Sequence, residues 1–235
     1  MTKRAFISHI TEEAGVAAKL KAALARDFLQ MLDVFVSSDG ESISAGDDWL
    51  KSIDNALQQS ALMLILCSPS SIRRPWINFE AGAAWMRRIP LIPLCHAGLT
   101  PGDLPALLSF RQGLLLTESR GLRQLYARIA QELGCAKPDS SFDSLAGALT
   151  KSGEALKPSE RDVDLLDRDR GIKRRLDEAL RHEKYKWRSL ESLAAAAGLS
   201  EDVAGDRLRA DSKVVFSKGK SGKIIVGLRE RVRDR

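Results

Sequence analysis

The run from residue 61 to residue 67, Ala-Leu-Met-Leu-Ile-Leu-Cys, is the feature that most restricts the fold of this chain. It contains no charged side chain, and Ser68-Pro69-Ser70-Ser71 follows it directly. An apolar run of this length that ends at turn-forming residues is typical of a buried strand in a parallel sheet. Pro75 then favours the first turn of a new helix. Proline has no backbone N–H, and an N–H at the first helical position would have no partner within the helix.

The chain up to Gly134 continues to alternate between short apolar runs and amphipathic runs. Further strands are predicted at residues 4–9, 32–36, 89–95 and 113–117, and a closing helix at residues 121–133, which ends at Gly134. Pro90 and Pro93 are expected near a sheet edge or at the ends of their strand. Strands that alternate with helices predict an α/β fold with a doubly wound parallel sheet.

Trp76 and Glu80 lie one helical turn apart and therefore share a face of the helix that follows the buried strand. The carboxyl ends of strands in open α/β sheets are where ligands bind. Each residue also has a purely structural interpretation, Trp76 as a packing anchor and Glu80 as a solvated acid on the helix surface. Trp85 is predicted to lie in the core.

Composition describes an ordinary globular protein, with 44% hydrophobic and 29% charged residues. No apolar run approaches the ~20 residues of a membrane helix, and the N-terminus lacks a signal-peptide core. The three cysteines, Cys67, Cys95 and Cys135, are odd in number and widely spaced, which predicts reduced thiols and a cytoplasmic protein. The three histidines show no metal-ligand spacing, so no metal site is predicted, and the adjacent pair Cys95-His96 is interpreted as structural.

Several ordered segments of the N-terminal part resemble a TIR domain. They are Phe6-Ile7-Ser8-His9, the loop at 37–49, the segment 53–57 with Ser60, Ser68-Pro69-Ser70, and Trp76 with Glu80. The resemblance covers about residues 3–134 and rests on the order and spacing of these motifs. It implies a flavodoxin-like fold with a parallel five-stranded sheet, in a TIR domain at residues 1–135.

TIR domains either signal as scaffolds by assembly or cleave NAD at the nicotinamide–ribose bond. Enzymatic members carry a glutamate on the helix after the third strand, four residues after a tryptophan, and Trp76 and Glu80 match this pattern. The resemblance therefore implies that Glu80 is the catalytic acid and that NAD is a substrate, with no cofactor. It also implies a set of substrate-binding residues, namely Phe6, Ser8, His9, Asp39, Trp49 and Trp76.

One position departs from the enzymatic pattern. Many enzymatic relatives have an arginine or a tyrosine near the position of His9, so the contact to the substrate's phosphates stays open, with Arg73 and Arg74 as candidates. Trp49 has a structural interpretation as well, since its side chain also suits packing.

The chemistry of this bond needs one prominent acid and not a pair. Nicotinamide leaves as a neutral group from a cationic base, so the leaving group needs no protonation. A carboxylate beside the ribose binds its hydroxyls and stabilises the positive charge of an oxocarbenium-like transition state. The chain has no Gly-x-Gly-x-x-Gly after its first strand and no Walker loop, which removes the main support for a dehydrogenase or a nucleoside-triphosphatase.

Residues 136–165 are rich in proline, serine and glycine and are predicted to be a linker with one short helix at 142–149. Residues 166–235 resemble a small α+β winged helix-turn-helix domain, with Ser189 and Ser200 as predicted helix caps. This segment holds 19 basic and 12 acidic residues, a net charge of +7, which exceeds the net +6 of the whole chain.

The partner of the C-terminal domain stays open between nucleic acid and protein. Lys218, Lys220 and Lys223 on the predicted wing favour nucleic acid. The second helix of the turn begins with Glu201 and Asp202, and acids on a leading turn would repel phosphates.

Three functions follow from these observations. The first is an NAD-cleaving effector, a glycohydrolase of bacterial anti-phage immunity that is activated by self-association of its TIR domains. The second is a non-enzymatic signalling scaffold, and the third is a DNA-binding regulator that uses the C-terminal domain. Hydrolysis, cyclisation to a cyclic ADP-ribose product and base exchange all stay open, because they depend on which nucleophile reaches the ribose.

Overall fold

The computed structural model describes residues 2–29, 31–36, 55–156, 158–219 and 221–232. The chain divides into two compact units, Met1–Ser159 and Glu160–Arg235. Among the described residues, no helix has both the length and the apolar character that a membrane span requires.

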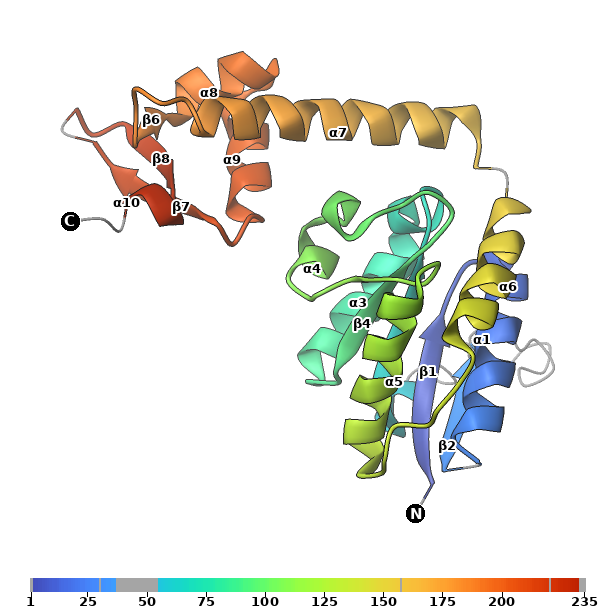
Figure 1. Ribbon diagram of the computed structural model, residues 1–235. Helices are drawn as coiled ribbons and strands as arrows, with labels where there is room; N and C mark the ends of the chain where they lie inside the picture. The colour runs from blue at the N-terminus through green and yellow to red at the C-terminus, as the bar shows by residue number, and fades with distance from the viewer. Residues whose placement is uncertain (1, 30, 37–54, 157, 220, 233–235) are drawn as a thin grey trace. The chain divides into compact units, whose positions relative to one another are not determined.

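The first unit is built on a five-stranded parallel sheet with the strand order β2-β1-β3-β4-β5 (Figure 1). The strands are β1 (Lys3–Ser8), β2 (Leu32–Val36), β3 (Ser60–Cys67), β4 (Leu91–Cys95) and β5 (Leu114–Leu115). The five predicted strands are all present, and the strand order is that of a flavodoxin-like sheet. The predicted fold class is confirmed.

The strand β4 is an inner strand, so the expectation that its prolines mark an edge is wrong for Pro93. The backbone groups of even-numbered residues along β4 form hydrogen bonds with β3, as the bond from His96 N to Cys67 O shows. The backbone groups of odd-numbered residues face β5 instead, and Cys95 O accepts a hydrogen bond from Leu116 N. Pro93 is odd-numbered like Cys95, so its backbone nitrogen faces β5. The paired part of β5 begins only opposite Leu94. The missing N–H of Pro93 therefore falls where the short β5 offers no partner.

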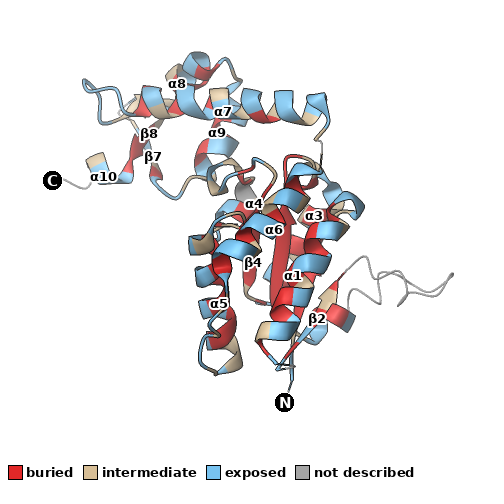
Figure 2. Cartoon of the chain, turned by 45° about the vertical axis from the view of Figure 1, so that its right-hand side comes forward, coloured by how far each residue is buried: buried red, intermediate tan, exposed pale blue. Residues whose placement is uncertain are grey.

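Helices cover both faces of the sheet. On one face the core joins the sheet to α1 (Ala14–Asp27), α5 (Ser119–Leu133) and α6 (Phe142–Glu154). The other face is covered by α3 (Pro75–Met86), which contacts β3 and β4. The connections include the short helices η1 (Thr11–Glu13), η2 (Ser71–Arg73), η3 (Pro101–Asp103) and α4 (Ala106–Ser109). Figure 2 shows the strands buried between helices whose outer surfaces are exposed.

The helix α5 lies unusually close to β5 at Gly121. A Cβ atom on Gly121 would lie 2.0 Å from the carbonyl oxygen of Leu115, a distance that backbone atoms do not tolerate. Gly134, in the left-handed conformation with φ 69°, ends the helix as predicted.

Replacing Gly121 by alanine is expected to lower the free energy of unfolding by about 3 kcal/mol, because the helix must move away from the sheet. Gly147 is a matched control: it lies on the exposed side of α6, and a Cβ atom there meets nothing within 4 Å. Gly147→Ala should stabilise by about 0.5–1 kcal/mol through helix propensity. Urea unfolding followed by circular dichroism measures both, and equal midpoints for the two variants would contradict the close approach.

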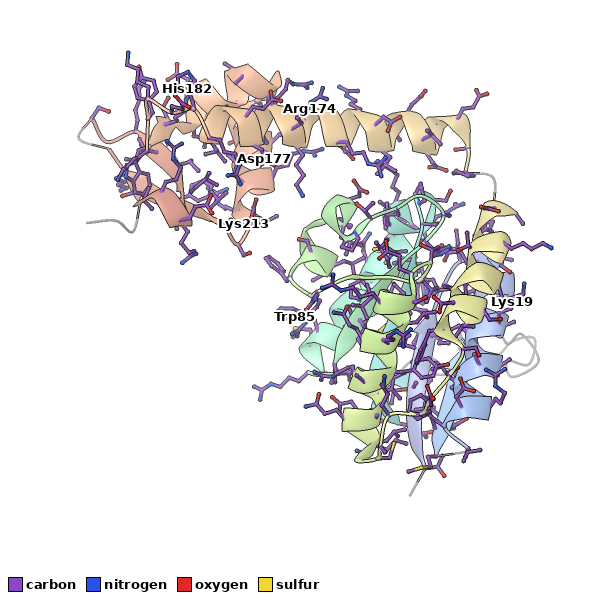
Figure 3. The ribbon with its side chains drawn as sticks, viewed as in Figure 1. Lys19, Trp85, Arg174, Asp177, His182 and Lys213 are labelled. Atoms are coloured by element: carbon purple, nitrogen blue, oxygen red, sulfur yellow. The ribbon has the colours of Figure 1, made fainter. Side chains whose placement is uncertain are left out.

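The segment predicted to be a linker contains a helix that belongs to the first unit. Phe142, Ala146 and Leu149 of α6 are buried in the core that α1 and α5 share. Lys19 of α1 donates to the carbonyl oxygen of Ala148 in α6 at 3.5 Å (Figure 3). The structure thus differs from the predicted boundaries at 135 and 165, since the division between the units falls after Ser159.

The second unit combines helices with a small antiparallel sheet of strand order β6-β8-β7. Its elements are α7 (Glu160–Leu180), β6 (Arg188–Ser189), α8 (Leu190–Ala197), α9 (Glu201–Arg209), β7 (Val214–Lys218), β8 (Ile224–Leu228) and α10 (Arg229–Val232). The Ser189 hydroxyl caps α8 and that of Ser200 caps α9, as predicted. The helix α7 begins six residues before the predicted domain start at 166.

Candidate functional site

The loop between β3 and α3 is fixed by two buried serines, and this sets the start of α3. The Ser71 hydroxyl accepts a hydrogen bond from Ser68 N at 2.8 Å and donates to Leu66 O at 3.2 Å. The Ser68 hydroxyl accepts a bond from Ser71 N at 3.2 Å. The helix then begins at Pro75, as the sequence predicts, and its inward face carries Ile77, Glu80, Ala81 and Ala84.

Glu80 is fully buried, with a relative exposure of 0%. The hydroxyl of Ser8, the last residue of β1, donates a hydrogen bond to Glu80 Oε2. The second carboxyl oxygen, Oε1, is buried and has no hydrogen-bond partner among the described residues. A buried acceptor without a donor is unfavourable by about 1–3 kcal/mol, so this oxygen is suited to receive hydroxyl donors from a ligand.

Burial raises the pKa of the Glu80 carboxyl from 4.5 to about 7, because the charged form loses its hydration. Hydrogen bonds from Ser8 and from the Trp76 indole act in the opposite direction and limit the rise. The interpretation of Glu80 as a solvated surface acid is therefore wrong. A carboxyl that titrates near neutral pH inside a fold is typical of functional sites.

Trp76 lies at the start of α3, half-buried, and its indole hydrogen bond acts on Glu80. Its ring packs against that of Phe79 with 5.1 Å between centroids, and Phe79 is 54% exposed. The structure thus brings Trp76, Glu80 and Ser8 together from two of the predicted motifs. The two aromatic rings are tilted by 34° to each other, and the Trp76 ring lies beside the acid.

The other predicted substrate-binding residues have different surroundings. Phe6 is fully buried and stacks on Phe35 with 5.5 Å between ring centroids, so it is part of the core beneath Ser8. His9 follows β1 and is 5% exposed. Asp39 and Trp49 lie outside the described residues.

The two arginines considered for the phosphates lie near the start of α3. Arg73 ends η2. Arg74 forms an exposed ion pair with Glu12 at 3.0 Å, which joins the start of α3 to η1. An exposed pair of this kind contributes about 0–1 kcal/mol, so Arg74 can leave Glu12 for a phosphate at little cost.

The sequence reasoning missed a buried acid–imidazole pair at the same end of the sheet. His96 Nε2 lies 3.1 Å from Glu13 Oε1, and both side chains are almost completely buried. The other oxygen of Glu13 accepts the Ile10 N–H at 3.2 Å. The two residues are 83 positions apart, so no local pattern could have paired them. This pair gives His96 a structural role, in agreement with its interpretation from sequence.

The cysteines are free thiols. Cys67 and Cys95 lie opposite each other on β3 and β4, and burial raises the pKa of Cys95 to about 12. Burial also raises the pKa of Cys67 well above its usual range, so neither thiol ionises near neutral pH.

Within the described ranges, no group of three or more His, Cys, Asp or Glu side chains could hold a metal ion.

Trp85 is not a core residue, and this prediction is wrong. Its side chain is 42% exposed and packs against Phe110, with 6.1 Å between ring centroids (Figure 3). The guanidinium carbon of Arg111 lies 4.7 Å from the Trp85 ring centroid, a cation–π contact. The inward face of α3 uses small residues, Ala81 and Ala84, and leaves this large ring at the outer edge.

Of the three lysines considered for nucleic acid, Lys223 forms an ion pair within the C-terminal unit, Lys218 is exposed, and Lys220 lies outside the described residues. Two arginines of α9 also form ion pairs within the unit. Arg207 of α9 pairs with Asp169 at 2.7 Å, and Arg209 pairs with Asp206 at 3.2 Å. Lys223 next to β8 pairs with Glu191 at 2.8 Å. The first turn of α9 presents Glu201 and Asp202 to solvent. This surface of α9 opposes contact with phosphates.

A model of the TIR domain family matches residues 5–126, more than half of the chain. No curated protein sequence gives a significant match. Among solved structures, one similar chain comes from the TIR domains of the activated Roq1 resistosome directly recognizing the pathogen effector XopQ. It is 11% identical, with a TM-score of 0.36, and the match covers 71% of this chain and 96% of that chain. On the extent of the family match, the protein belongs to the TIR domain family.

Proposed function

We propose that the first unit is an enzyme that cleaves NAD at the nicotinamide–ribose bond, with Glu80 as the catalytic acid. The observation that carries the proposal is the state of this carboxyl group: it is buried, its Oε2 is held by Ser8, and its Oε1 has no hydrogen-bond partner in the part of the chain that the structure describes. This Oε1 atom is suited to accept hydrogen bonds from the hydroxyl groups of a ribose. Trp76 and Phe79 offer flat rings against which the nicotinamide can stack.

In this mechanism the ionised Glu80 stabilises positive charge that develops on the ribose as the bond to nicotinamide breaks. Nicotinamide departs as a neutral molecule, so no acid is needed on its side. The low-dielectric surroundings of Glu80 strengthen the attraction between the carboxylate and the oxocarbenium-like ribose. NAD is consumed in the proposed reaction and is therefore a substrate and not a cofactor.

The experiment that tests the proposal is the release of nicotinamide from NAD by the purified full-length chain at high concentration. Enzymatic activity in this proposal requires self-association of TIR domains, so the assay is repeated with a crowding agent. Chromatography of the ribosyl product then distinguishes ADP-ribose from a cyclic product. Absence of nicotinamide release from an assembled state, verified by light scattering, would leave the scaffold function in its place.

The rate of NAD cleavage is expected to fall as the pH decreases through about 7. The pKa of Glu80 is raised to about 7, so about a tenth of the molecules carry the reactive carboxylate at pH 6 and about nine tenths at pH 8. Values of kcat/KM, from initial rates at NAD concentrations well below KM and measured from pH 4 to 8.5, give this acidic limb, because kcat/KM reports the pKa of the ligand-free enzyme. A midpoint near 4.5, the pKa of a solvated glutamate, would show that Glu80 is not the group whose ionisation controls the rate.

For the second unit we propose a winged-helix-like module that binds protein and controls the assembly of an effector of bacterial immunity. The favouring observation is the exposed face of α9, which carries Val203, 44% exposed, beside Glu201 and Asp202. An apolar residue next to acids suits a protein surface with complementary basic charge better than a phosphate backbone. Binding to duplex DNA that is strong and falls steeply with salt would instead support a DNA-binding regulator.

A further inference from the structure

Ser8 was expected to contact the substrate, but its surroundings indicate a different role. Its side chain is fully buried, and its hydroxyl hydrogen is donated to Glu80 Oε2. A serine hydroxyl has one hydrogen to donate, so this bond leaves Ser8 no donor for a ligand. The residue therefore acts on the acid.

The end of β1, where Ser8 lies, is held between two neighbouring strands. Ser8 pairs with Ile65 of β3, and the preceding Ile7 pairs with Val36 of β2. Glu80, in contrast, extends from a helix through a side chain with three rotatable bonds. A fixed hydroxyl that bonds one carboxyl oxygen determines where the other oxygen lies.

The same bond acts on the charge of Glu80. Burial disfavours its ionised form, and the hydrogen bonds from Ser8 and Trp76 favour it. Among the described residues, other ionisable groups of the surrounding elements include His9 after β1, Glu13 in η1, Cys67 at the end of β3, and Arg73 and Arg74 before α3. The causes that act on the pKa of Glu80 are nevertheless burial, Ser8 and Trp76.

We propose that Ser8 is a positioning residue that holds Glu80 Oε2, presents Oε1 to the ribose, and favours the ionised carboxylate. This inference rests on the proposed function of the site. Ser8 acts through Glu80 and does not itself touch the substrate.

The test compares Ser8→Ala, Ser8→Thr and Ser60→Ala in the full-length chain. Ser8→Ala removes a hydrogen bond to a charged group and should lower kcat for NAD cleavage by roughly ten- to a hundredfold. KM should change little, and the acidic limb of the pH profile should move to higher pH. Ser8→Thr keeps the hydroxyl on a strand position that suits a β-branched residue, and should restore most of kcat.

Ser60→Ala is the matched control, because Ser60 lies at the opposite end of the sheet and donates to Ala56 O at 2.7 Å. It should leave kcat and the pH profile unchanged. An increase in KM for Ser8→Ala, with kcat and the pH profile as in the unaltered protein, would make Ser8 a substrate contact and overturn the proposal.

A second measurement needs no catalysis. The carboxyl carbon of Glu80 is followed by NMR in ¹³C-glutamate-labelled protein, and its signal is identified by its loss in Glu80→Gln. Without NAD, Glu80 should titrate at higher pH in Ser8→Ala than in the unaltered protein, and equal titrations would overturn the role of Ser8. If the titrations differ as expected but the assembled, unaltered protein releases no nicotinamide, the proposed function fails while the Ser8–Glu80 interaction is supported.

Discussion

Replacing Glu80 by glutamine is expected to reduce NAD cleavage by about a hundred- to a thousandfold or more. The amide is nearly isosteric with the carboxyl group but carries no negative charge, so it cannot stabilise the developing oxocarbenium charge. The hydroxyl of Ser8 can still bond to the amide oxygen, and the shape of the site is retained. The loss then reports on charge and not on packing.

The same substitution is expected to stabilise the folded protein at pH 8. The pKa of Glu80 is 4.5 in a solvated chain and about 7 in the folded protein. Between these values the folded state binds more protons than the unfolded state, so the free energy of unfolding decreases as the pH rises through this range. Above pH 7 the total loss is about 3 kcal/mol. Glutamine does not ionise and avoids this loss, which corresponds to a gain of about 6–12 °C in Tm.

Nicotinamide release and thermal unfolding, both at pH 8, measure the two effects. Glu154→Gln is the control, since Glu154 is exposed at the end of α6, on the other face of the sheet. It should change neither quantity. Glu80→Gln protein that still cleaves NAD at the normal rate would remove Glu80 from the reaction. A scaffold would keep its biological output in cells that carry Glu80→Ala, whereas an effector enzyme would lose it.

The α/β fold could be predicted because its strands have strong local signals. The run at 61–67 and the breakers around it determine one strand and the start of the next helix without reference to the rest of the chain. The side chains of the site were predicted from a family resemblance, and the structure brings Ser8, Trp76 and Glu80 together. The Ser8–Glu80 hydrogen bond itself could not be predicted, because it joins residues 72 positions apart.

The errors have identifiable physical causes. The proline, serine and glycine content of residues 136–165 indicated a linker. The spacing of Phe142, Ala146 and Leu149 along one helix face indicated a core helix instead, and it was given too little weight. Trp85 was assigned to the core from its size and apolar character alone. Whether a large ring at the end of a helix is covered depends on tertiary neighbours, and here Phe110 and Arg111 cover the ring only in part.

A fragment that ends at residue 135 is expected not to fold, whereas a fragment that ends at residue 159 should fold cooperatively. The shorter fragment lacks α6 and exposes the core surface that Phe142 and Leu149 cover. The Phe142 ring packs edge-on against Tyr126, with 4.9 Å between centroids. Ser140 and Tyr126 both bond Asp27 Oδ2 at 2.8 Å, and the shorter fragment loses the first of these bonds. Loss of two buried apolar side chains alone removes about 5 kcal/mol or more, which is comparable with the stability of a whole domain.

A single substitution isolates the effect within the longer chain. Phe142→Ala should lower the free energy of unfolding by about 3–5 kcal/mol, because the ring is 1% exposed and its removal leaves a cavity beside Tyr126. Ser144→Ala is the matched control on the exposed side of the same helix and should stay within about 0.5 kcal/mol of the unaltered protein. Urea unfolding of residues 1–159 measures both. If the fragment 1–135 unfolds cooperatively at the same urea concentration as 1–159, then α6 contributes nothing to the fold, and the division of the chain after Ser159 does not describe its folding units.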